Sequence, residues 1–249
     1  MSRNFDLMHD MERYHEVRTV QTIKPAAPRV PKAEEVAYQK PVAVDDGSVR
    51  LVQQLLAPQA QDAPRMVVFA GIEHGNGCTY AAVSAAETLA ANGDRSVCLV
   101  EANFRSPAMA GMFRTNSDHG LSQALSQDGS IRSFAKSVRD DSLWVMPAGS
   151  LAAESPNLLS SERLMARCGE LREEFDLVIV DAPPLAHYAD AIALGRLADG
   201  VVLVIEAETT RKEAAQAAVE NLRISDVRIL GAVLNKRVYP IPDQIYSKL

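Results

Sequence analysis

Residues 66–79 read MVVFAGIEHGNGCT, a run of apolar residues that leads into a loop with three glycines. The five consecutive apolar residues at 66–70 are typical of a strand that is buried on both faces of a sheet. The alanine-rich residues 79–91 that follow carry apolar side chains at the spacing of an amphipathic helix. A strand, a glycine-rich loop and a helix in this order form the usual setting of a phosphate-binding loop.

The same kind of apolar run recurs along the chain. Further runs occupy residues 97–100, 143–146, 177–180, 201–205 and 229–234, and residues 210–222 again show helical spacing. The gaps between several runs have the length of one crossover helix with its loops. This pattern predicts an α/β protein, a three-layer α/β/α sandwich around a mostly parallel, doubly wound sheet. In such a sheet, ligands bind at the carboxyl ends of the strands.

The composition is that of a globular protein. Of the 249 residues, 47% are hydrophobic and 23% are charged, and the net charge is −6. The negative charge argues against a nucleic-acid-binding protein, and no apolar run reaches the roughly 18–20 residues of a membrane-spanning helix. The N-terminal residues lack the apolar core of a secretory signal, and the three cysteines are too far apart to indicate a zinc site or a disulfide framework. We expect a cytoplasmic protein.

The chain divides into three segments by composition. Residues 1–45 hold four prolines and little periodic apolar content, which predicts a flexible N-terminal arm. Residues 46–238 contain every apolar run and form the predicted folded domain. Residues 239–249 remain as a short C-terminal tail.

The glycine-rich loop has most of the chemistry that binds a phosphate group. Glycines such as Gly75 and Gly77 let successive backbone N–H groups turn toward one anion, and the N-terminus of the following helix adds a favourable dipole. Thr79 is placed to bind Mg²⁺, but Cys78 occupies the usual position of the lysine that reaches the phosphates. From the loop alone, a phosphate site and a tight turn that binds nothing are both open.

Two other predicted strands end in polar residues. Glu101 and Asn103 follow the strand at 97–100, and residues i and i+2 of an extended segment point the same way, so both side chains would face one site. Asp181 follows the strand at 177–180 and fits the aspartate that holds Mg²⁺, usually through water. The alternative is that these residues simply cap strand ends in solvent.

Together these segments resemble the cytoplasmic domain of the bacterial tyrosine kinases of capsule and exopolysaccharide assembly. This family lies in the MinD/ParA-like branch of P-loop proteins. Besides the glycine loop, the resemblance is carried by VCLVEANFRSP at 97–107, GLSQAL at 120–125, MPAG at 146–149, PNLL at 156–159, FDLVIVDAPP at 175–184, LADGVVLV at 197–204 and GAVLN at 231–235. It covers residues 46–238 and implies a P-loop NTPase fold.

The resemblance implies a bound ATP or ADP with Mg²⁺ and assigns roles to individual residues. The phosphate groups would be bound by Gly75, Asn76, Gly77, Cys78, Thr79 and Tyr80. Glu101 would activate the tyrosine hydroxyl, and Asn235 would lie near the adenine. Thr79, Asn103 and Asp181 would form the metal side of the site. The family phosphorylates tyrosines of its C-terminal tail within a ring of subunits, and here the tail offers Tyr239 and Tyr246.

The chain departs from the family pattern at the reacting end of the site. Lysine is replaced by Cys78, the proline of the loop by His74, and the two aspartates of the second loop by Glu101 and Asn103. The family's oligomerisation motif, ExxRxxR, keeps only Arg50. Loss of one preorganised charged contact commonly costs about 3 kcal/mol, or about a hundredfold in rate, unless another cation replaces it. Arg105 is the nearest replacement along the sequence.

The sequence therefore predicts a kinase-family protein with impaired or absent phosphoryl transfer, a pseudokinase of exopolysaccharide or capsule biosynthesis. It would act as a cytosolic partner or regulator of a membrane polysaccharide co-polymerase, recruited to the inner face of the membrane, and a homo-oligomer remains open. One alternative is an active tyrosine kinase. Another is a positioning ATPase of the MinD/ParA type, which is disfavoured because that branch uses two lysines where this loop has Glu73 and Cys78.

Overall fold

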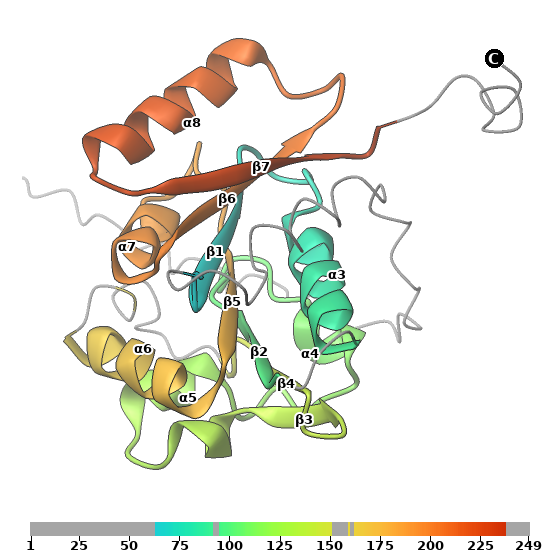
Figure 1. Cartoon of the computed structure of the whole chain (residues 1–249), viewed down its shortest axis with the longest axis vertical. Helices are drawn as coiled ribbons and strands as arrows, with labels where there is room; N and C mark the ends of the chain where they lie inside the picture. The colour runs from blue at the N-terminus through green and yellow to red at the C-terminus, as the bar shows by residue number, and fades with distance from the viewer. Residues whose placement is uncertain (1–62, 92–94, 151–158, 160–161, 238–249) are drawn as a thin grey trace, which may run out of the picture. The chain divides into compact units, whose positions relative to one another are not determined.

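The computed structural model describes residues 63–91, 95–150, 159 and 162–237. These residues form a seven-stranded sheet with helices on both faces (Figure 1). The predicted three-layer sandwich with a mostly parallel sheet is confirmed. The proposed arm at 1–45, the first part of the proposed domain and the tail at 239–249 lie outside the described residues.

Each predicted apolar run forms a strand, and one further strand was not predicted. The strands are β1 (Met66–Gly71), β2 (Val97–Glu101), β3 (Lys136–Arg139), β4 (Leu143–Met146), β5 (Leu177–Ala182), β6 (Gly200–Glu206) and β7 (Ile229–Asn235). Their order in the sheet is β3-β4-β2-β5-β1-β6-β7. All neighbours pair in parallel except β3, which runs antiparallel to β4 at the sheet edge.

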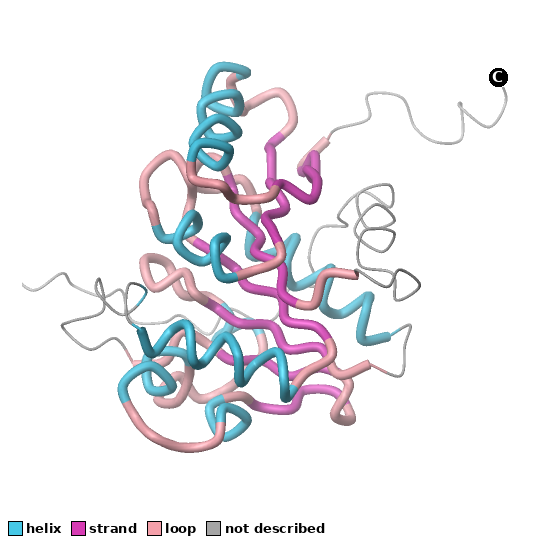
Figure 2. Tube along the Cα trace, turned by 60° about the vertical axis from the view of Figure 1, so that its left-hand side comes forward, coloured by secondary structure: helices cyan, strands magenta, loops and turns pink. Residues whose placement is uncertain are grey.

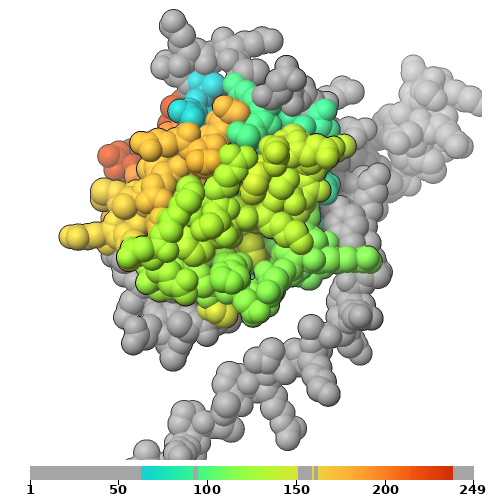
Figure 3. All heavy atoms as spheres, turned by 90° about the horizontal axis from the view of Figure 1, so that it is seen from below, coloured from blue at the N-terminus to red at the C-terminus, as the bar shows by residue number. Residues whose placement is uncertain are grey.

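The helices pack on the two faces of this sheet (Figure 2). Their bounds are α3 (Cys78–Ala91), α4 (Met109–Met112), α5 (Leu121–Ser126), α6 (Glu162–Glu174), α7 (Asp190–Leu197) and α8 (Lys212–Ile224), with a 3₁₀ helix at Ile131–Phe134. Figure 3 views the domain from below, at the end where β3 lies. The segment from α4 to β4 forms the surface there, next to α6. Within the described ranges, no helix combines the length and hydrophobicity that a membrane span requires.

The core has one cluster on each face of the sheet, as the alternation of side chains along a strand requires. On β1, Met66, Val68 and Ala70 pack with α6 and α7 residues, whereas Val67 and Phe69 pack with alanines of α3. Every residue of β1, β2 and β5 is buried. Full burial on both faces explains why these strands read as continuous apolar runs rather than alternating ones.

The register of the central strands sets the position of the polar residues. β5 lies between β2 and β1, with Asp181 opposite Glu101 on one side and opposite Phe69 on the other. β1 ends at Gly71, two residues beyond Phe69, and the glycine-rich loop follows. The carboxyl edge of the sheet thus brings Asp181, Glu101 and the glycine-rich loop together.

Candidate functional site

The glycine-rich loop is a turn built on two left-handed residues. Gly75 has φ +82° and Gly77 has φ +79°, values that side chains other than glycine rarely adopt. A Cβ atom added at Gly77 would also overlap Nδ2 of Asn235, whereas one added at Gly75 would meet no atom within 4 Å. Gly77 is therefore required both by its backbone conformation and by the close approach of β7.

Asparagine side chains hold this turn in shape. Asn76 is buried, its Oδ1 accepts a hydrogen bond from Glu73 N at 2.6 Å, and its Nδ2 lies 3.4 Å from Glu206 Oε2. Asn235, the last residue of β7, donates from Nδ2 to the carbonyl oxygen of Asn76 at 2.9 Å. The structure thus places Asn235 against the loop itself, and its predicted proximity to an adenine stays a prediction.

Thr79 and Asp181 join the loop to the centre of the sheet. Thr79, in the first turn of α3, donates from Oγ1 to Asp181 Oδ2 at 2.6 Å. Asp181 is fully buried, and its Oδ1 finds no hydrogen-bond partner of good geometry in the described part of the chain. Burial raises the pKa of Asp181 to about 7, while the contacts with Thr79 and the Cys78 thiol oppose the rise and the charge of Glu101 adds to it.

These two side chains suit a magnesium ion. A carboxylate and a threonine hydroxyl are the ligands that P-loop proteins offer to Mg²⁺. The unpaired oxygen of Asp181 is an acceptor that a cation would satisfy. The described residues contain no group of three or more His, Cys, Asp or Glu side chains that would chelate a metal without further ligands. Any cation here would therefore be shared with a phosphate group or with water.

Asn103 is not joined to this pair in the structure. β2 ends at Glu101, and the Oδ1 of Asn103 accepts a hydrogen bond from Ser106 N at 3.3 Å, which closes a turn within its own loop. That hydrogen bond does not decide whether Asn103 and Glu101 face one site, so their predicted common site stays a prediction. The proposed metal role of Asn103 stays a prediction.

Cys78 lies beside Asp181 as a neutral thiol. Burial, the charge of Asp181 and a hydrogen bond to that carboxylate together raise its pKa well above the ordinary value, more than contacts with Gly71 and Ala182 lower it. A thiol with a raised pKa carries no charge at neutral pH and donates a weak hydrogen bond at most. Position 78 therefore gives the loop no positive charge.

Glu101 is buried and holds three backbone N–H groups. Its Oε1 accepts from Ala108 N and Met109 N at the start of α4, and its Oε2 accepts from Ala148 N beyond β4 at 3.0 Å. Burial raises the pKa of this carboxyl, while the three hydrogen bonds lower it. The side chain thus ties three segments together, and its predicted role toward a tyrosine hydroxyl is not tested by these contacts.

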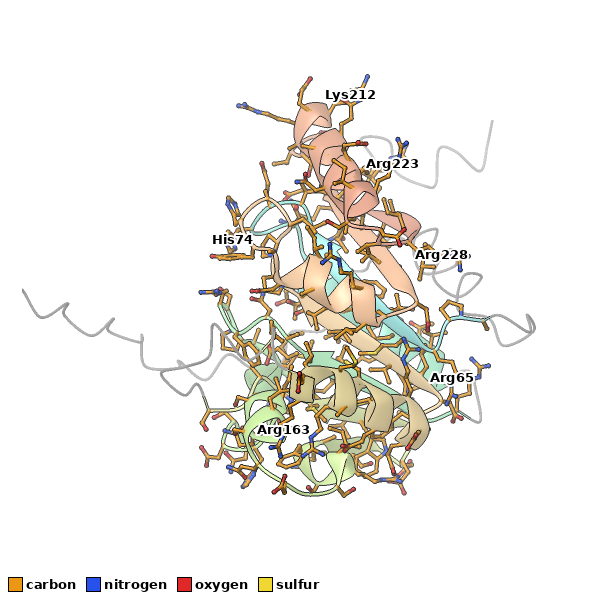
Figure 4. The ribbon with its side chains drawn as sticks, turned by 90° about the vertical axis from the view of Figure 1, so that its left-hand side faces the viewer. Arg65, His74, Arg163, Lys212, Arg223 and Arg228 are labelled. Atoms are coloured by element: carbon orange, nitrogen blue, oxygen red, sulfur yellow. The ribbon has the colours of Figure 1, made fainter. Side chains whose placement is uncertain are left out.

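Three loops bring a group of rings and charges to the exposed side of the site. The rings of His74 and His187 are stacked with centroids 5.0 Å apart, and Tyr188 lies edge-on to both. The Arg105 guanidinium lies 4.9 Å from the Tyr188 ring centroid and 4.0 Å from Asp190. Figure 4 shows His74 at the outer edge of the domain. Arg105 is the replacement cation expected from the sequence, and its contacts with Tyr188 and Asp190 place it in this exposed group.

Lys236 is a site residue that the sequence reasoning missed. It follows β7, and its Nζ donates to the carbonyl oxygen of Gly75 at 2.7 Å and to Glu206 Oε1 at 3.2 Å. Burial alone would raise the pKa of Glu206, but its hydrogen bonds to Lys236 and Asn76 and the charge of Lys236 lower it. The strand order is the signal that could have revealed this contact. In the sheet, β7 lies two positions from β1, and both strands end at the same edge.

Comparisons with known proteins agree with this geometry. No family model matches the chain. The tyrosine-protein kinase YwqD of Bacillus subtilis is 33% identical over 161 residues, which cover 65% of this chain and 68% of YwqD. The chain belongs to the bacterial tyrosine kinase family. The tyrosine-protein kinase CpsD of Streptococcus agalactiae, another relative, is 27% identical over 173 residues, 69% of this chain and 75% of CpsD.

Solved kinase domains share the fold. The VpsO kinase domain superposes with a TM-score of 0.70 at 26% identity, covering 77% of this chain and 95% of that domain. The kinase domain of the Escherichia coli tyrosine kinase ETK gives the same TM-score at 23% identity. A plasmid partition protein from Borrelia burgdorferi, at 17% identity and a TM-score of 0.54, shares the fold alone. The P-loop fold expected for this family member is confirmed.

The first prediction separates the two glycines of the loop. Gly75→Ala should lower the free energy of unfolding by about 1 kcal/mol, the cost of a left-handed backbone. Gly77→Ala should lower it by about 3 kcal/mol, because Asn235 must also move and lose its hydrogen bond to Asn76. Urea unfolding of both variants measures the difference. Equal losses would contradict the close approach of β7.

The second prediction concerns pH. The pKa of Asp181 is about 7 in the folded state, above the unfolded value, so its contribution to stability is complete below about pH 4 and is lost as the pH rises through 7. Asp181→Asn removes this loss, and the variant should gain up to about 4 kcal/mol over the wild type between pH 4 and pH 8. Urea unfolding at several pH values measures the difference in slope.

Asp176→Asn is the matched control. Backbone hydrogen bonding from Ser96 lowers the pKa of Asp176, so its stabilisation is present above the unfolded pKa and is lost as the pH falls. This variant should therefore show the opposite trend against the wild type. A pH-independent difference between Asp181→Asn and the wild type would show that burial does not perturb Asp181.

Proposed function

We propose that this chain is a nucleotide-binding member of the tyrosine kinase family with impaired or absent phosphoryl transfer. We further propose that it serves exopolysaccharide or capsule assembly as a cytosolic partner or regulator of a membrane polysaccharide co-polymerase. The observation that carries the first part is the neutral thiol of Cys78 against Asp181, in a loop that keeps its left-handed glycines and the Thr79–Asp181 hydrogen bond.

Nucleotide binding is supported by groups that do not depend on the missing lysine. The left-handed glycines turn the loop onto the N-terminus of α3, a 14-residue helix whose first N–H groups and dipole attract an anion. Asn76 and Asn235 hold the turn in place without a ligand. Thr79 and Asp181 would hold Mg²⁺, which would neutralise phosphate charge when bound.

Weak catalysis is supported by two positions. Phosphoryl transfer depends on positioning and on charges placed around the transferred group, and the loop has a neutral thiol where the family has its lysine. Removal of one such charge costs about 3 kcal/mol, or about a hundredfold in rate. Glu101 would also have to weaken its hydrogen bonds to three backbone N–H groups before it could accept a tyrosine proton.

The role in polysaccharide assembly is supported by the names of relatives. The succinoglycan biosynthesis transport protein ExoP of Rhizobium meliloti is 29% identical over 175 residues, which are 69% of this chain and 22% of ExoP. The chain therefore matches one part of a longer transport protein. It spans 75% of CpsD, a protein of more similar length. Both matches support a kinase-like domain that acts together with a polysaccharide transport protein.

An active tyrosine kinase is the second candidate, and one observation favours it. Thr79 and Asp181 would hold Mg²⁺ as in an active kinase. An active kinase would then need only another cation near the phosphates in place of the lysine. A positioning ATPase has less support, because neither Glu73 nor Cys78 can take the part of a lysine and the likeness to partition proteins concerns the fold alone.

The third prediction tests phosphoryl transfer. The purified chain, incubated with labelled ATP and Mg²⁺, should place only trace label, or none above background, on Tyr239 and Tyr246. Cys78→Lys, which returns the family's cation to the loop, should raise incorporation by about a hundredfold over the unmodified chain. Phosphopeptide mass spectrometry identifies the labelled tyrosine.

Two controls make the result decisive. Asp181→Ala in the Cys78→Lys background should abolish any label, which excludes a contaminating kinase. A thermal-shift titration with ADP and ATP should raise the melting temperature of the unmodified chain, because a ligand that binds only the native state stabilises it. Clear label on the unmodified chain that Asp181→Ala removes would overturn the proposed impairment. An unchanged melting temperature would overturn the proposed nucleotide site.

A further inference from the structure

A lysine from another strand lies on the phosphate loop. Lys236 Nζ is 2.7 Å from the carbonyl oxygen of Gly75, and its Cε lies 3.9 Å from the position that a Cβ of Gly77 would take. The side chain therefore crosses the glycine turn from the end of β7. Its charge is located within the loop that lacks a lysine of its own.

We propose that Lys236 binds the phosphate chain of the nucleotide, and so supplies for binding, though not for phosphoryl transfer, the positive charge that position 78 lacks. The inference rests on the proposed nucleotide site and names the residue that replaces the lost cation. The loop and β7 are linked by two neighbouring residues, Asn235 and Lys236, through the carbonyl oxygens of Asn76 and Gly75.

The contacts of Lys236 leave it able to bind an anion. An ammonium group has three N–H donors, and the contacts with Gly75 and Glu206 use two of them. The side chain is 48% exposed, so an incoming phosphate can reach it. A nucleotide phosphate carries more negative charge than the single carboxylate of Glu206, and the ammonium gains by turning toward it.

The backbone conformation of Lys236 is uncommon for a residue that has a side chain. Its φ is +57°, in the left-handed region that residues with a Cβ seldom occupy. Such conformations persist only where surrounding contacts hold them, and they gather at functional sites. Here Asn235 anchors the preceding residue to the loop and Glu206 contacts the Lys236 ammonium, and the Lys236 side chain passes close to Gly77.

Arg105 is the rival cation, and its contacts place it elsewhere. Its guanidinium lies over the Tyr188 ring at 4.9 Å and near Asp190 at 4.0 Å, on the side of the stacked histidines. These contacts hold Arg105 against the segment that follows β5, whereas Lys236 donates to the glycine turn. The geometry therefore favours Lys236.

The test compares nucleotide affinities of the full-length chain and its variants by calorimetry with ADP and ATP in the presence of Mg²⁺. Lys236→Met should weaken ATP binding by about 10- to 100-fold, the effect of one hydrogen bond to a charged group. Lys236→Arg keeps the charge and should stay within a few-fold of the wild type. Lys136→Met is the matched control, because Lys136 is an exposed lysine of β3, at the opposite edge of the sheet from β7, and the change should leave the affinity as it is.

A rescue experiment separates charge from scaffolding. Cys78→Lys in the Lys236→Met background should restore most of the lost affinity, because it returns a cation to the loop by another route. Urea unfolding of the unliganded Lys236→Met and wild-type proteins measures the contribution of Lys236 to the loop itself. If Cys78→Lys and Lys236→Arg both fail to rescue, Lys236 only supports the loop and the proposal is overturned.

The outcomes also distinguish this proposal from the one on which it rests. If the wild type binds ATP and Lys236→Met binds it equally well, the relocated cation is wrong and the nucleotide site stands. If Arg105→Gln, and not Lys236→Met, reduces affinity, the cation is Arg105 and the proposal is again overturned. If the wild type binds neither ADP nor ATP, both the nucleotide site and the role of Lys236 fail.

Discussion

The structure of this site depends on the hydrogen bond from Thr79 to the buried carboxylate of Asp181. It ties the first turn of α3 to β5, which lies between β1 and β2 in the sheet. Asp181 is fully buried and has one oxygen without a good partner, so its negative form is disfavoured until a cation or further donors arrive. The glycine loop, the helix N-terminus and the carboxyl edge of the sheet therefore act as one unit.

Under the proposed function, the chain would keep the parts of the family's site that bind and change the parts that react. The binding parts are backbone groups fixed by packing: the left-handed glycines, the buried Asn76 and the contact with Asn235. The reacting parts are side chains, and Cys78 and Glu101 have become a neutral thiol and a support for three backbone N–H groups. Lys236 lies where it can restore one charge, so binding and transfer need not have been lost together.

The sequence predicts most of the fold because continuous burial leaves a continuous apolar run. It misses β3, an edge strand whose Lys136 and Arg139 are exposed, and it cannot show where an extended segment ends. β2 ends at Glu101, so Asn103 lies beyond the strand, and its side chain accepts a hydrogen bond from Ser106 N within its own loop. The partners of Lys236 are about 30 and 160 residues away along the chain, a proximity that only the strand order creates.

The central claim is that the Thr79–Asp181 pair marks the metal and phosphate end of a nucleotide site. The most direct measurement is an anomalous-difference map of crystals grown with ADP and Mn²⁺ in place of Mg²⁺. The map should show a metal peak about 2 Å from Thr79 Oγ1, near Asp181, with the phosphates on the amides of the glycine loop. A nucleotide or metal bound elsewhere, with the loop empty and Thr79 still bonded to Asp181, would contradict it.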